Sequence, residues 1–154
     1  MPYELLVFLH VGSMFLGTAL AIGPSTMLFL IARNRDRGTI QRAFGLVAPV
    51  FRLGGLAYGL GIVFGLLTAA SGSIPLTTPW LITSYLLVVL LIATNLVFER
   101  WTRMVAAVAA RDDVSQEAID FVVSRSIAPA ALSGMILITL GIVFIMVVKP
   151  SIAG

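Results

Sequence analysis

A histidine and a methionine one helical turn apart are the residues of this chain whose types and spacing point to chemistry. His10 is the only histidine among 154 residues, and it lies in the apolar segment YELLVFLHVGSMFLGTALAIGPS. On a helix, His10, Ser13 and Met14 share one face. An imidazole can be an axial ligand of haem iron with methionine as the second ligand, and the same pair suits Cu(I).

The chemistry of His10 stays open at the level of sequence. A buried imidazole needs a partner, because an unpaired polar group costs several kcal/mol in lipid. His10 is therefore a haem ligand, a copper ligand with Met14, a group of another function, or a packing residue bonded to a carbonyl or hydroxyl of a neighbouring helix. The chain has no cysteine and no phosphate-binding loop, metal-binding cluster or catalytic triad. These absences favour a non-catalytic protein.

The elements that must position His10 are those of a membrane protein. Hydrophobic residues make up 59% of the chain and charged residues 11%, against about 25% charged in soluble domains. Four stretches are long enough to cross a bilayer, which takes about 20 helical residues. We predict one domain, residues 1–154, an all-α integral membrane bundle of four transmembrane helices. The predicted spans are about 3–32, 49–70, 79–101 and 127–148.

Proline and capping residues predict the helix boundaries. Pro49 suits the first turn of a helix, so residues 39–48 are expected to form a separate interfacial helix or a re-entrant approach. Pro79 is expected to open the third span. Before the fourth span, Asp113 is expected to cap a short amphipathic helix, with Gln116 completing a capping box.

Tryptophans and arginines predict the position of the chain in the membrane. Trp80 and Trp101 are 21 residues apart, about 31 Å along a helix, and are expected to mark the two interfaces. Arginines gather in the first and third loops: Arg33, Arg35, Arg37, Arg42, Arg100, Arg103, Arg111 and Arg125. The middle loop has none, which predicts an N-out/C-out protein of the cell (inner) membrane with cytoplasmic basic loops.

The basic residues are expected to contact lipid headgroups of the bilayer and no nucleic acid, because the loops are short and tied to topology. This assignment covers Arg33, Arg35, Arg37, Arg42 and Arg52. Small residues are expected to mark close helix contacts. The predicted packing positions are Gly55, Gly59, Gly61, Gly65, Gly134 and Gly141. They predict that the first, second and fourth spans pack together, while the third faces lipid or a partner.

The segment LLVFLHVGSMFLGTALAIGPS resembles the first helix of the CopD/HemJ-like group of small four-span membrane proteins. The shared features are an early leucine-histidine pair, then small residues, then a proline about 14 positions on. The arginine-rich first loop and the PWL opening of the third span fit as well. The resemblance implies that His10 binds haem or copper. HemJ-type members oxidise protoporphyrinogen, but the first-helix tryptophan, further histidines and third-span lysine of the group are absent here.

Two functions follow from the sequence. The first is a non-catalytic membrane subunit that packs within a larger assembly, such as a respiratory or other redox complex, with other membrane subunits or a second copy as partners. The alternative is a CopD/HemJ-like protein that uses His10, with Met14 as a candidate second ligand, to bind copper or a haem such as haem b.

Overall fold

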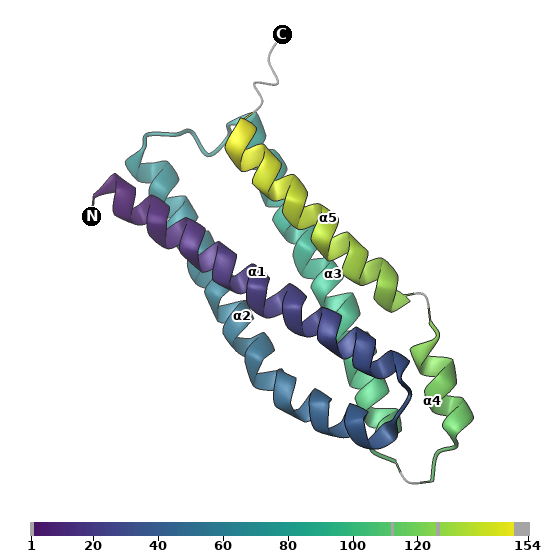
Figure 1. The fold of residues 1–154 in the computed structure, drawn as a ribbon. Coiled ribbons are helices and arrows are strands. Elements are labelled where there is room, and N and C mark those ends of the chain that lie inside the picture. Colours follow the sequence, from purple (N-terminus) through teal and green to yellow (C-terminus); the bar gives the residue numbers. More distant parts are fainter. Residues whose placement is uncertain (1, 112, 126, 150–154) are drawn as a thin grey trace.

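The computed structural model describes residues 2–111, 113–125 and 127–149, and helices account for most of them. The helices are α1 (Tyr3–Arg33), α2 (Arg37–Ser71), α3 (Pro79–Ala109), α4 (Gln116–Val123) and α5 (Ile127–Val148) (Figure 1). Four helical segments are long and apolar enough to cross a membrane. The predicted all-α class with four candidate spans is thereby confirmed, and Pro79 opens α3 as expected.

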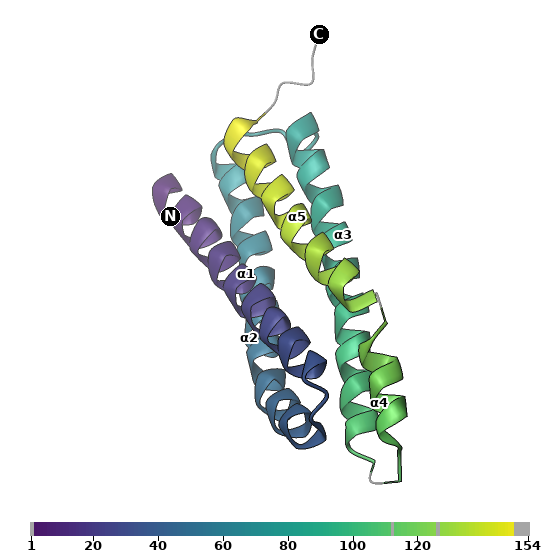
Figure 2. The same ribbon diagram turned by 45° about the vertical axis from the view of Figure 1, so that its right-hand side comes forward.

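The four long helices form two pairs. α1 packs along α2, and α3 packs along α5, whereas contacts between the pairs are far fewer. Figures 1 and 2 show the pairs diverging toward the end that carries both chain termini. We call this the terminal end and the opposite end, beside α4, the α4 end. The expectation that the first, second and fourth spans pack together while the third faces lipid or a partner is wrong, since α5 packs mainly on α3.

α2 is one helix of 35 residues, so the expected break before Pro49 is wrong. Pro49 lies inside the helix, and Figure 1 shows α2 bent in its first half. Ile40, Phe44 and Val47 are buried at helical spacing, and this apolar face holds residues 39–48 against the rest of the bundle. Gln41 Nε2 also donates to the carbonyl of Ala109 over 2.6 Å, which satisfies a group at the end of α3.

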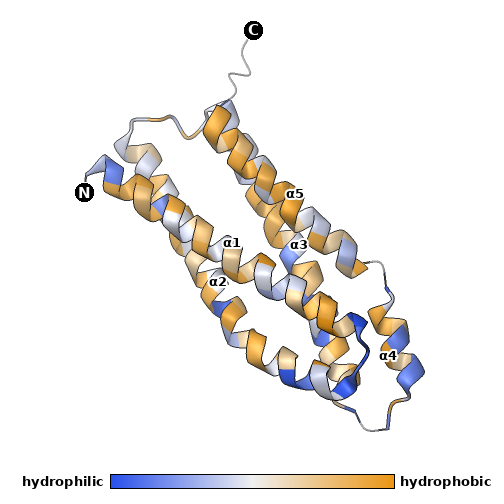
Figure 3. Cartoon of the chain, in the orientation of Figure 1, coloured by the Kyte–Doolittle hydropathy of each residue, from blue (hydrophilic) through white to orange (hydrophobic). Residues whose placement is uncertain are grey.

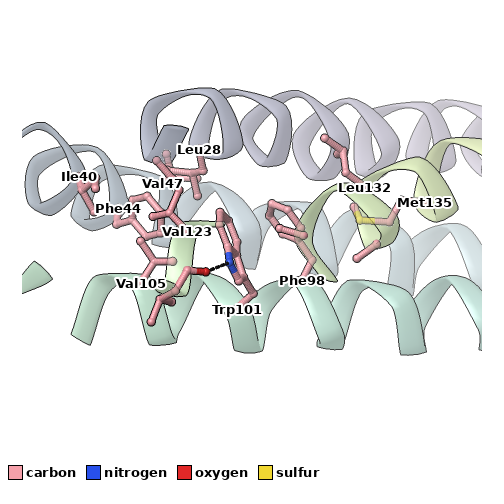
Figure 4. Close-up of a cluster of buried hydrophobic side chains, with 14 of the residues drawn as sticks. Leu28, Ile40, Phe44, Val47, Phe98, Trp101, Val105, Val123, Leu132 and Met135 are labelled. Carbon is pink, nitrogen blue, oxygen red and sulfur yellow. Dashed lines mark hydrogen bonds between the residues drawn. The ribbon is translucent and has the colours of Figure 1, made fainter. Parts of the chain in front are cut away.

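A cluster of buried hydrophobic side chains extends from the α4 end toward the middle of the bundle (Figure 4). Trp101 is only 2% exposed, and its Nε1 donates to the carbonyl of Val122 in α4 over 3.2 Å. Its ring centroid lies 5.4 Å from that of Phe98 and 6.3 Å from that of Phe29. The prediction that Trp101 marks a membrane interface is wrong, because the indole found both an apolar site and a hydrogen-bond acceptor inside the protein.

α4 begins later than expected. Its N-cap is Ser115, whereas the Asp113 carboxylate accepts hydrogen bonds from Arg111 over 2.8 and 3.2 Å. Gln116 is the first helical residue, and its Nε2 donates to the carbonyl of Arg35 over 3.0 Å. The predicted capping box is therefore wrong. The Asp113 carboxylate binds the neighbouring Arg111 guanidinium group, and Gln116 connects α4 to the α1–α2 loop through its hydrogen bond.

A candidate ligand-binding cavity beside His10

His10 is fixed by a hydrogen bond to the neighbouring helix. Its Nδ1 lies 2.7 Å from the carbonyl oxygen of Gly61 in α2. A carbonyl only accepts, so Nδ1 carries the hydrogen, and in the neutral ring Nε2 keeps its lone pair. No residue that the structure describes hydrogen-bonds to Nε2. The contact is the one that the packing interpretation predicts, and it leaves the second nitrogen available.

Two glycines make room for the side chains of α1. The His10 ring lies on Gly65, where a Cβ atom would come within 2.8 Å of Cε1. One turn along, the Met14 sulfur lies where a Cβ of Gly61 would be 2.5 Å away. Both side chains thus occupy space that any larger residue in α2 would fill. The sulfur of Met14 is part of the α1–α2 contact.

The predicted packing glycines divide into two groups. Gly61 and Gly65 lie in the α1–α2 contact, and Gly134 and Gly141 in α5 face Thr94 and Leu87 of α3. A Cβ at Gly55 or Gly59 would meet nothing within 4 Å, so the packing prediction is wrong for these two within the chain. The reason is their place on the outward face of α2. Two further glycines lie in the same α1–α2 contact: Gly54 of α2, beside Leu20, and Gly17 of α1, beside Tyr58.

A cavity of about 600 Å³ opens between the two helix pairs toward the terminal end. His10 and Met14 line it, together with residues of α2, α3 and α5. It extends from Tyr3 to Thr18 along α1, about 23 Å at 1.5 Å per residue. This volume falls within the range of about 300–1,000 Å³ that is usual for small-molecule sites. The divergence of the two pairs at this end therefore produces a space of ligand size.

Few polar groups reach this cavity, which is mostly walled by aliphatic and aromatic side chains. The hydroxyls of Thr18 and Tyr58 lie 3.1 Å apart, and the buried hydroxyl of Thr139 faces the same phenol. Lys149 Nζ lies 5.6 Å from the centre of the Trp80 ring at the edge of the cavity. Apolar walls with a few placed polar groups are typical of sites for lipophilic ligands.

The described residues hold no group of three or more His, Cys, Asp or Glu side chains that could bind a metal ion. A metal ion at this cavity would depend on the single imidazole of His10 and on ligands of other kinds. Copper would need a thioether or other soft donor. Two methionines line the cavity: Met14, whose sulfur lies in the α1–α2 contact, and Met146 of α5.

The predicted headgroup-binding arginines lie at different levels of the bundle. Arg33 ends α1, Arg35 lies in the loop, and Arg37 opens α2 and donates to the carbonyl of Val114 over 2.6 Å. Arg42 Nε donates to the carbonyl of Gly38 over 3.1 Å. Arg52 is exposed further along α2.

Because no known protein matches the chain, its function is inferred from the geometry of the site. The resemblance of the first helix to the CopD/HemJ-like group stays a prediction. No protein-family model, curated protein or solved structure matches the chain.

Proposed function

We propose that the chain is an integral membrane protein that crosses the bilayer four times. The supporting observation is that three helices each contain an apolar stretch of similar length, measured from the terminal end of the bundle. α5 has 22 residues, about 33 Å. Arg52 lies 19 residues before the end of α2, about 29 Å, and Arg100 lies 21 residues after the start of α3, about 31 Å. These lengths match a hydrocarbon core of about 30 Å.

The proposed orientation is N-out/C-out in the cell (inner) membrane. The arginines of the two basic loops lie at or beyond this depth, and Figure 3 shows hydrophilic residues gathered at the α4 end. Lysine and arginine in short loops favour the cytoplasmic side. The α4 end, with its buried cluster, then extends into the cytoplasm, and the cavity beside His10 lies in the outer part of the membrane.

Cysteine labelling tests this orientation in a chain that has no cysteine of its own. Ser73→Cys, in the exposed α2–α3 loop, is expected to react with a membrane-impermeant maleimide applied to intact cells. Thr39→Cys, exposed near the start of α2, is expected to react only after the membrane is permeabilised. The opposite pattern would reverse the proposed orientation, and labelling of both from outside would contradict membrane insertion.

Within this frame, the geometry best supports a non-catalytic protein that binds a lipophilic cofactor, with haem b as the candidate. The observation that carries this is the His10–Gly61 hydrogen bond, because a histidine that ligates a metal usually donates its other nitrogen to a carbonyl or carboxylate. His10 Nε2 would hold the iron, and the apolar walls would enclose the macrocycle. Lys149, at the edge of the cavity, could pair with a carboxylate group of the haem. Bound haem would supply one-electron chemistry.

The absorption spectrum of the purified protein tests the cofactor. After expression with added haem, we expect a Soret band of one haem per chain, lost in His10→Ala. Met14→Ala alters the band only if the thioether is the second ligand, and Ser13→Ala serves as a control on the same helix. A stoichiometric haem that survives His10→Ala, or no haem in the parent protein, would refute this assignment.

If His10 is only a packing residue, its variants behave differently. The parent protein then has no Soret band, and His10→Ala lowers stability by about 1–3 kcal/mol, because it leaves a space and an unpaired group. His10→Gln keeps a hydrogen-bond donor and is expected to recover much of that loss. Thermal unfolding of both variants in detergent distinguishes this case from haem binding.

A second candidate function is the membrane subunit of a larger redox assembly. The observation that favours it is the outward position of Gly55 and Gly59, one turn apart with nothing within 4 Å. Such pairs let the backbones of two membrane helices approach closely. Association with another subunit or a second copy should then depend on these two glycines, whereas folding of the chain should not.

A further inference from the structure

Three arginines meet in a second pocket, at the α4 end of the bundle. The pocket has a volume of about 350 Å³ and lies between the end of α1, residues 123–125 and the first turn of α5. Its polar wall includes Arg33, Arg35 and Arg125, and its apolar wall includes Phe29 and Pro129. Arginines about 90 positions apart in the sequence thus line one pocket beside apolar side chains.

The pocket keeps an excess of positive charge. Asp120 lies 3.2 Å from Arg35 Nη1. Within the described ranges 2–111, 113–125 and 127–149, no carboxylate pairs with Arg33 or Arg125. Their guanidinium carbons lie 5.8 and 5.7 Å from the ring centres of Phe29 and Phe121, and Arg125 Nη1 lies 3.8 Å from the sulfur of Met104. Three guanidinium groups and one carboxylate leave two net positive charges.

Arg35 is held there by its backbone. Its φ is 59°, in the left-handed region where glycine is favoured and a larger side chain is disfavoured. The Arg35 amide donates to the carbonyl of Ala32 over 3.0 Å, and its own carbonyl accepts from Gln116 over 3.0 Å. The hydrogen bonds of its amide and its carbonyl therefore hold the backbone of Arg35 in a conformation that favours glycine.

The pocket lies at the depth of the proposed cytoplasmic interface. Arg125 comes two residues before α5, whose length matches the hydrocarbon core, and Pro129 lies in the first turn of α5. The guanidinium groups are then level with lipid phosphates, and the apolar wall continues into the membrane.

We propose that this pocket binds a phospholipid headgroup that carries two negative charges. The ligand would be the phosphomonoester of phosphatidic acid or the two phosphates of cardiolipin. Guanidinium groups bind phosphate oxygens through paired, charge-assisted hydrogen bonds, and basic pockets between membrane helices on the cytoplasmic side are suited to such headgroups. A singly charged headgroup would leave one positive charge uncompensated. The inference rests on the proposed membrane insertion and is independent of haem.

Native mass spectrometry of the full chain in detergent tests the ligand. Each chain is expected to retain one cardiolipin or phosphatidic acid, at least about tenfold more tightly than phosphatidylglycerol, the change expected for one lost charge-assisted hydrogen bond. Phosphatidylcholine should not compete. Equal retention of phosphatidylglycerol, or displacement by millimolar inorganic phosphate, would overturn the proposal. The second result would indicate a soluble phosphate as the ligand. The cysteine labelling above tests membrane insertion separately.

Charge-matched variants locate the site. Arg33→Gln and Arg125→Gln are each expected to weaken cardiolipin binding at least about tenfold. Arg42→Gln removes the same charge from the same end of the molecule but outside the pocket, and it should leave binding unchanged. Asp120→Asn removes the opposing charge and should strengthen binding. Equal weakening by Arg42→Gln would show that general surface charge, and not this pocket, attracts the lipid.

Arg35→Gly separates binding from folding. Glycine suits the left-handed backbone at this position, so we expect a melting temperature in detergent no lower than that of the parent, together with loss of cardiolipin retention. Retained binding in a folded Arg35→Gly protein would contradict the role of this side chain. If neither this variant nor Arg33→Gln and Arg125→Gln affects retention, the pocket is not the site.

Discussion

Gly61→Leu is expected to force α1 away from α2. A Cβ at this position would lie 2.5 Å from the sulfur of Met14 and 3.3 Å from its backbone nitrogen. The methionine side chain can turn aside, but the helix backbone cannot without opening the contact, and the carbonyl that holds His10 would move with it. We expect a loss of about 3 kcal/mol, the upper part of the usual range for overpacking. Thermal unfolding in detergent, followed by circular dichroism, measures it.

Gly55→Leu is the matched control for this change. It introduces the same side chain into the same helix, six residues earlier, where a Cβ meets nothing within 4 Å. Its melting temperature should equal that of the parent, although its association with other helices should weaken. Equal stability of both variants would mean that Gly61 faces outward, and the arrangement of α1 on α2 would then be wrong.

Trp101→Ala is expected to disrupt the α4 end. The change would leave a space among Phe29, Phe98 and their neighbours, and it would orphan the carbonyl of Val122. Removal of a buried tryptophan side chain costs about 3–5 kcal/mol. We expect a correspondingly lower melting temperature and faster amide hydrogen exchange in α4, which is tied to α3 through this indole.

Two substitutions provide the comparison for Trp101→Ala. Trp101→Phe keeps most of the apolar contact and loses the hydrogen bond, so it should cost about 1–3 kcal/mol. Trp80→Ala removes the same side chain at the terminal end, where the ring is only half-buried, and should cost less than Trp101→Ala. If Trp80→Ala and Trp101→Ala are equally destabilising, the main core does not lie at the α4 end.

The number and type of the long helices follow from the sequence, but their limits do not. The 49–70 span fell inside a longer α2 because Pro49 is tolerated in the middle of a helix that neighbouring groups support, whereas its preference for the first turn suggested a start. The predicted interface position of Trp101 is wrong for a related reason. An indole with an apolar ring and one donor fits a membrane interface and a protein core equally well, and only the carbonyl of Val122 decides.

The pairing of the helices and the position of the cavity cannot be predicted from sequence patterns within single helices. α3 is apolar on nearly every side, so no face of it indicates that α5 covers one of them. Gly55 and Gly61 have the same residue type in the same helix, yet one faces outward and the other supports Met14. His10 could be expected to bond to a neighbouring helix, and it does. The cavity joins side chains of four helices and could not be expected from any one of them.

The pairing of neighbours along the chain bears on how the protein is made. α1 and α2 are adjacent in sequence, and α3 and α5 are separated only by α4. The two helices of each pair are therefore synthesised in close succession. The first hairpin can therefore form before the second is synthesised. A chain cut between Gly72 and Thr78 would yield two fragments that each keep their closest internal contact. Their reunion would depend on the buried residues around Trp101.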